Sequence, residues 1–109
     1  MEKRYSAAVL GIHCAMSYSD ALRCGMGSAK LSSSDHKTAA NDLRSLLSSR
    51  EFEQKQGADR LEKLLARKSR VEYSTVATRK DEAEDIVKQA ERFASWAENA
   101  GRQLGIEGW

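Results

Sequence analysis

The chain has 109 residues, 40% of them hydrophobic, and a net charge of +2. This length suits one domain over 1–109 and leaves no room for a second, and the small net charge argues against disorder. No apolar run approaches the ~18 residues of a membrane span and no signal peptide opens the chain, so we expect a cytoplasmic protein. Proline is absent and β-branched residues are few, which favours an all-α fold.

The first half of the sequence predicts two helices. One is expected over about 5–24, where apolar residues recur at helical spacing and glycines follow directly. The second is expected over about 35–48, where Ser34 or Asp35 can accept hydrogen bonds from the first free N–H groups and leucines and alanines form one stripe.

The second half predicts two longer helices. A helix is expected over about 50–74, opened by Ser48 and Glu51 at the spacing of a capping box; the alternative is that Gly57 splits a short turn from a main helix that starts at Ala58. The last helix is expected over about 79–104, where alanines repeat every seventh residue in a pattern typical of bundles, with a frayed tail at 106–109. Because short connections make sequential helices antiparallel neighbours, the expected fold is all-α, an antiparallel, up-and-down four-helix bundle.

The sequence contains no phosphate loop, dinucleotide fingerprint, zinc pattern or nucleophile elbow. His13 and Cys14 are adjacent, so on a helix they point about 100° apart and do not easily share an ion. We therefore expect no metal and no cofactor, and we lean against an enzyme.

Charged side chains interrupt two apolar stripes. Lys68 lies on the leucine stripe of the third helix, and Asp20 lies four residues after Met16 on the first, on the same side as His13. An unpaired buried charge costs several kcal/mol, so Lys68 and Asp20 are each the obvious partner of the other. With Tyr73 they form a candidate inter-helix polar site. The alternatives are a purely structural ion pair, or a solvated Asp20 with the stem of Lys68 lying along the core.

Two further features are candidates for contact with a partner. Lys63, Arg67 and Arg70 lie on one strip at i, i+4 and i+7, a spacing that can hold phosphates; the alternative is a solvated face balanced by nearby carboxylates. Trp96 flanks the apolar face of the last helix, where it either closes the edge of the core or contributes to a dimer interface.

Taken in order, four segments resemble the HEPN superfamily of small helical bundles: GIHCAMSYSDALRCGMG, SSSDHKTAANDLRSLL, LEKLLARKSRVEYS and DEAEDIVKQAERFASWAE. The resemblance covers about 5–104 and implies a HEPN-like bundle that forms a homodimer. Many members are RNases with an Arg, four to six residues and then a His; others bind RNA or nucleotides, or serve as partners of nucleotidyltransferases. No His follows His36 here, and Tyr73 in its place is a poor general base at neutral pH.

The resemblance without the Arg–His motif predicts a non-catalytic binding or interaction module for a nucleotide, an RNA or a protein such as a nucleotidyltransferase, with no membrane partner. Two alternatives stay open. One is a purely structural or assembly bundle. The other is a degenerate, metal-independent RNase in which Arg67 and Lys68 hold the scissile phosphate.

Overall fold

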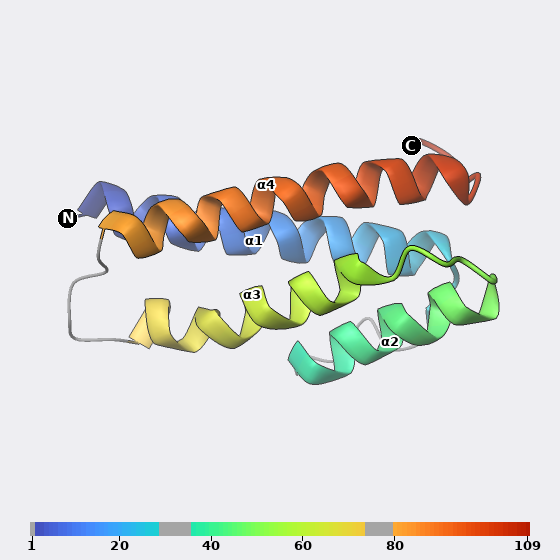
Figure 1. The fold of residues 1–109 in the computed structure, drawn as a ribbon, viewed down its shortest axis with the longest axis horizontal. Helices are drawn as coiled ribbons and strands as arrows, with labels where there is room; N and C mark the ends of the chain where they lie inside the picture. Colours follow the sequence, from blue (N-terminus) through green and yellow to red (C-terminus); the bar gives the residue numbers. More distant parts are fainter. Residues whose placement is uncertain (1, 29–35, 74–79) are drawn as a thin grey trace.

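A computed structural model describes residues 2–28, 36–73 and 80–109, with side chains for 7–28, 38–68 and 80–109. Within these ranges there is no strand. The helices are α1 (Glu2–Gly25), α2 (His36–Ser49), α3 (Gln56–Tyr73) and α4 (Lys80–Gln103). They pack side by side along one long axis (Figure 1), so the expected all-α four-helix bundle is confirmed.

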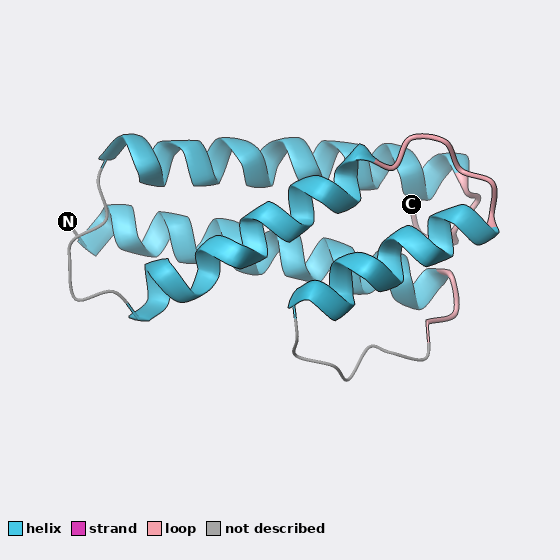
Figure 2. Ribbon diagram, turned by 60° about the horizontal axis from the view of Figure 1, so that its bottom comes forward, coloured by secondary structure: helices cyan, strands magenta, loops and turns pink. Residues whose placement is uncertain are grey.

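The helices differ in direction from a simple up-and-down order. α1 and α4 run the same way, because Gly11 lies against Val87 of α4 and, farther along both helices, Tyr18 hydrogen-bonds to Glu98. Figures 1 and 2 show α2 running in this direction too, whereas α3 runs against the other described helices.

The length of the first connection explains this difference. Residues 26–35 separate α1 from α2, and a chain of that length reaches about 33 Å when extended. The 14 residues of α2 span only about 21 Å. The chain is therefore long enough for α2 to start beside the middle of α1 and run parallel to it, which a short connection would not allow.

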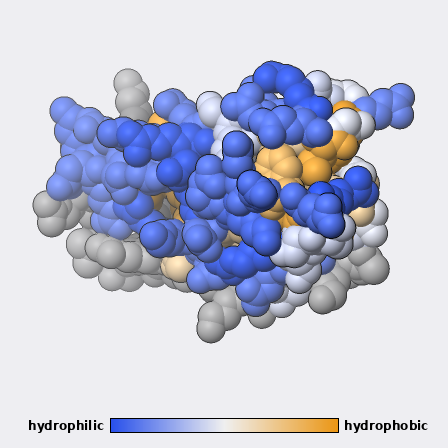
Figure 3. All heavy atoms as spheres, turned by 45° about the vertical axis from the view of Figure 1, so that its right-hand side comes forward, coloured by the Kyte–Doolittle hydropathy of each residue, from blue (hydrophilic) through white to orange (hydrophobic). Residues whose placement is uncertain are grey.

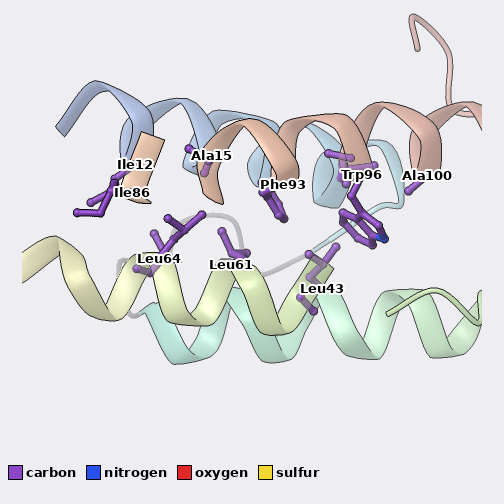
Figure 4. Close-up of a cluster of buried hydrophobic side chains, with 14 of the residues drawn as sticks. Ile12, Ala15, Leu43, Leu61, Leu64, Ile86, Phe93, Trp96 and Ala100 are labelled. Atoms are coloured by element: carbon purple, nitrogen blue, oxygen red, sulfur yellow. The ribbon is translucent and has the colours of Figure 1, made fainter. Parts of the chain in front are cut away.

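One apolar core joins all the helices. α3 lies against both α1 and α4, and α2 packs on α1 and α3, so the bundle is thicker at the end that α2 covers (Figure 1). Figure 4 shows the buried side chains meeting between the α1–α4 layer and α3. The predicted sevenfold spacing in α4 is confirmed, because its buried residues include Ala83, Ala90 and Ala97.

The capping box predicted to open the third helix is wrong. Glu51 has a left-handed backbone with φ of 56°, and its N–H donates to the carbonyl of Ser48 at 3.0 Å. The next N–H, of Phe52, donates to the carbonyl of Leu47 at 2.9 Å. This pair of hydrogen bonds is the Schellman motif that ends a helix. Phe52 packs against the core, which fixes the turn, and α3 begins only at Gln56.

Replacing Glu51 with glycine is expected to raise the free energy of unfolding by about 0.5–1 kcal/mol. In the left-handed region a residue with a Cβ is destabilised by about 1–2 kcal/mol, and glycine removes this strain. Glycine also increases the conformational entropy of the unfolded chain, which offsets part of the stabilisation. Chemical denaturation of E51G measures the change. The control is R50G at the preceding exposed position, where φ is not positive and glycine is expected to destabilise. Destabilisation by E51G as well would contradict the strain argument.

The C-terminal tail is packed, so the predicted fraying at 106–109 is wrong. Gly105 has φ of 68° and turns the chain back, with the N–H of Ile106 donating to the carbonyl of Gly101 at 3.0 Å. Ile106 then lies against Gly25 at the end of α1, and the ring of Trp109 lies on Gly101. The absence of side chains at these two glycines lets the tail approach both long helices closely.

Candidate functional site

The residues of the predicted polar site do not come together. His13 and Asp20 are exposed on α1, and Lys68 is half-buried on α3. Asp20 approaches Arg23 of its own helix at 3.4 Å, and within the described ranges Lys68 forms no ion pair. The side chain of Tyr73 lies outside the described residues. The predicted Asp20–Lys68 pair is therefore wrong.

The antiparallel course of α3 explains why the predicted partners are apart. Arg67 binds Asp85 near the start of α4, whereas Tyr18 binds Glu98 near its end. Positions 85 and 98 are separated by about 20 Å at ~1.5 Å per residue. The two predicted partners lie within two residues of one or the other of these contacts, so they lie far apart along the bundle.

A different ion pair joins two helices inside the molecule. Nε of Arg23 in α1 donates to Oδ2 of Asp42 in α2 at 2.8 Å, and the side chains are 1% and 8% exposed. The hydroxyl of Ser28 also donates to Oδ2 of Asp42. Both charges are therefore removed from water and hydrogen-bonded, which is the condition under which a buried pair is tolerated. The pair fixes the end of α1 to the middle of α2.

The sequence carried a signal for this pair that was not used. Arg23 lies seven residues after Met16 and three before Met26, and Asp42 lies three residues after Ala39 and four before Leu46. Each is thus a charge on a helical stripe, the same criterion that singled out Lys68. The parallel course of α1 and α2, which brings the two together, was not predictable from that spacing.

The basic strip of α3 lies in a polar groove of about 450 Å³ between α3 and α4. Lys63 and Arg67 line it, but Asp85 and Asp59 line it as well. Nη1 of Arg67 donates to Oδ2 of Asp85 at 2.7 Å, and this hydrogen bond lowers the pKa of Asp85. The predicted phosphate contacts are therefore partly neutralised by carboxylates. The side chain of Arg70 lies outside the described residues.

Trp96 closes the edge of the core. It is 7% exposed, its Nε1 donates to the carbonyl of Gln54 at 2.9 Å, and its ring packs on Phe93 and on Gly57. Of the two roles predicted for Trp96, the structure thus shows the packing role, and little of the side chain is left for a partner.

The face of α1 turned away from the core has an unusual composition. Its exposed residues at heptad spacing are Ala7, Leu10, Cys14, Ser17, Ala21 and Cys24, which we call the α1 outer face. None of them is charged, and Leu10 is 67% exposed. Much of the surface in Figure 3 is by contrast hydrophilic, around a limited apolar patch. Among the residues whose side chains are described, Leu10 is the exposed large apolar side chain, and this makes the α1 outer face a candidate contact surface.

A groove of about 520 Å³ borders this face near the C-terminal end of α1; we call it the tail groove. Its lining comprises Ser17, Tyr18 and Ala21 of α1, Glu98 and Arg102 of α4, and Gly108 and Trp109. The rings of Tyr18 and Trp109 meet edge to face with centroids 6.0 Å apart. The Tyr18 hydroxyl donates to Oε1 of Glu98 at 2.7 Å, and this hydrogen bond raises the pKa of Tyr18. The groove thus has aromatic walls held in place by polar contacts.

Comparisons with protein-family models, with curated proteins and with solved structures found no match. Within the described ranges, no helix has both the length and the apolar character that crossing a membrane requires. The same ranges bring no three His, Cys, Asp or Glu side chains into a group fit to hold a metal ion.

Proposed function

We propose that this chain is a non-catalytic interaction module that binds a protein partner through the α1 outer face. The observation that carries the proposal is the composition of α1. One apolar stripe at heptad spacing is directed into the core, and a second, uncharged stripe is directed to solvent. Packing in the core explains only the first stripe. Because Leu10 is 67% exposed and adds nothing to that core, the outer face is best explained as a surface for another protein.

A nucleotide or RNA segment is the second candidate ligand, as the HEPN resemblance implies. The polar groove between α3 and α4 supports it, since Arg60, Lys63 and Arg67 line one side. The carboxylates of Asp59 and Asp85 line the same groove and repel phosphates. This charge balance favours the protein-binding proposal over the nucleic-acid one.

An RNA assay combined with titration separates these possibilities. The purified chain, incubated with single-stranded RNA in the presence of a chelator, is expected to leave the RNA intact and to bind labelled RNA only weakly even at low salt, where phosphate contacts are strongest. Metal-independent cleavage that disappears in K68A would overturn the non-catalytic proposal. Tight RNA binding that weakens in K63A but not in L10D would favour the nucleic-acid candidate instead.

A further inference from the structure

We propose that the tail groove is a binding site for a carboxylate that carries an aromatic or branched apolar group. The apolar group lies against the rings of Tyr18 and Trp109, and Arg102 holds the carboxylate. This inference goes beyond the proposed function, because it assigns a ligand of defined chemistry to a groove for which that function names no ligand.

The aromatic rings give the groove its capacity for an apolar group. The rings of Tyr18 and Trp109 lie at 62° to each other with centroids 6.0 Å apart, and Ala21 lines the groove beside them. The volume of about 520 Å³ falls in the range of about 300–1,000 Å³ that is typical of small-molecule sites. Because the Trp109 ring rests on Gly101 and the Tyr18 hydroxyl is bonded to Glu98, both walls are in place before a ligand binds.

Arg102 supplies the charge that holds the carboxylate. Its Nη2 is 3.7 Å from Oε2 of Glu98, which is longer than a hydrogen bond, and its Nη1 donates to Oδ1 of Asn99 at 3.3 Å. A guanidinium has five N–H donors in a planar fork that fits a carboxylate with two parallel hydrogen bonds. Since the side chain is 59% exposed, the rest of this fork is accessible to a ligand in the groove.

Arg44 shows how many carboxylates such an arginine holds in this chain. Arg44 and Arg102 each donate to the asparagine three residues earlier on the same helix. Arg44 also binds the carboxylates of Asp59 and Glu62 at 2.6 and 2.8 Å. Arg102 has one carboxylate among the described residues, at the longer distance, so its guanidinium has capacity for a second one.

Glu98 is compatible with an anionic ligand. Its Oε1 accepts the hydrogen bond from the Tyr18 hydroxyl at 2.7 Å, and its Oε2 faces Arg102, so both oxygens are directed at groups of the chain itself. A cationic ligand would have to displace Arg102 from Glu98 and then lie beside its positive charge, which is unfavourable. A ligand carboxylate instead joins Glu98 on the arginine, as two carboxylates do on Arg44.

The indole of Trp109 is a second donor in the wall. Its Nε1 has no hydrogen-bond partner within the described part of the chain, whereas Nε1 of Trp96 donates to the carbonyl of Gln54 at 2.9 Å. An indole N–H donates and does not accept. The hydrogen-bonding capacity that the chain leaves unused in this groove therefore lies mainly in donors, which match the oxygens of a carboxylate.

Nuclear magnetic resonance of the isotope-labelled full chain tests the ligand class, because each of the two tryptophans gives its own indole N–H signal. The probes are phenylpropionate, phenylpropionamide and phenylpropylamine, which share a phenyl ring on a short chain and differ in the end group. Phenylpropionate is expected to shift the Trp109 signal with a dissociation constant of about 0.1–5 mM, as suits a fragment of this size, and to leave the Trp96 signal in place. The amide is expected to bind about three- to tenfold more weakly. An amide or amine that binds as tightly as phenylpropionate overturns the inference.

The variant R102Q tests the residue that holds the carboxylate. It is expected to weaken phenylpropionate binding about three- to tenfold and to change phenylpropionamide binding by less than about twofold, so that a general disturbance of the groove is distinguished from the loss of the charge. The matched control is R92Q, because Arg92 is also an exposed arginine on α4 but does not line the groove. Equal effects of R102Q and R92Q on phenylpropionate overturn the assignment.

The source of the carboxylate is tested with a tripeptide that ends in phenylalanine. If the peptide binds at least as tightly as phenylpropionate, and its amidated form does not, the carboxylate is the C-terminus of another chain. If phenylpropionate binds and the peptide does not, the ligand is a free small molecule. Failure of all these probes to shift the Trp109 signal overturns this inference and leaves the proposed function intact, because the protein partner is assigned to the surface around Leu10.

Discussion

Replacing Asp42 with leucine is expected to lower the free energy of unfolding by about 3–5 kcal/mol, because it leaves the guanidinium of Arg23 buried without its main carboxylate. Arg23 is 1% exposed, and its second carboxylate, Asp20, is 3.4 Å away and 60% exposed, so it offers weak compensation. Removing the cation instead, in R23M, is expected to cost a similar amount. Chemical denaturation of each single variant measures these losses.

The double variant R23M/D42L separates a buried pair from two independent contacts. With both charges gone, no charge is left without water or a partner, so the loss is expected to be clearly smaller than the sum of the single losses. The control is R44M, which removes the cation of two inter-helix pairs whose carboxylates, on Asp59 and Glu62, are 66% and 39% exposed; exposed pairs contribute about 0–1 kcal/mol each. Additive losses would show that Arg23 and Asp42 are not coupled.

The second large effect is expected at Gly57, in the first turn of α3. A Cβ added there would overlap the ring of Trp96, which is held by packing on Phe93 and by the hydrogen bond from its Nε1 to the carbonyl of Gln54. The variant G57A is therefore expected to lose about 2–3 kcal/mol or more, the cost of overpacking a rigid site, despite the better helix propensity of alanine. Thermal and chemical unfolding measure the loss.

Two companion variants isolate the cause. At Gly11, also inside a helix, an added Cβ would be 3.4 Å from the nearest atom, in Ala90, so G11A is expected to be neutral or to stabilise by up to about 1 kcal/mol. In a W96A background, where the ring is absent, G57A is expected to stop destabilising. If G57A lowers stability equally with and without the ring, the clash with Trp96 is not its cause.

The sequence predicted the helices better than their ends and directions. The sevenfold spacing of Ala83, Ala90 and Ala97 arises because one side of a single helix faces the core. Such a periodicity can be read from the sequence of that helix without knowing which helices pack against it. The start of α3 was mispredicted because Ser48 and Glu51 fit a capping box by spacing alone, whereas they belong to the turn that ends α2, and the packing of Phe52 decides where the chain turns. The tail was mispredicted for the same kind of reason: its order depends on contacts of Trp109 with distant helices.

The candidate site was less predictable than the fold. A charged residue at a position of a helix's apolar stripe is a sound sign of a buried charge within that helix. The same sign marks Arg23 and Asp42 as readily as Lys68 and Asp20. Which charges meet depends on helix direction and register, and α3 runs so that Lys68 lies far from Asp20. The outer face of α1 was not predicted for another reason. Uncharged residues occur on both sides of this helix, so its sequence lacks the contrast between one apolar and one polar side on which such predictions depend.

The parallel pairing of α1 with α4 has a consequence for how the chain acquires its structure. These helices stand at opposite ends of the sequence, yet they contact each other from Gly11 beside Val87 to Tyr18 bonded to Glu98, and the tail after α4 adds the contact of Ile106 with Gly25. During synthesis, α1 therefore emerges long before α4. The side of α1 that packs against α4 stays exposed until the last quarter of the chain has been made. Contacts between such distant segments slow folding compared with a bundle of neighbouring hairpins. A nascent chain that ends before α4 would expose the core side of α1 to aggregation or to chaperones.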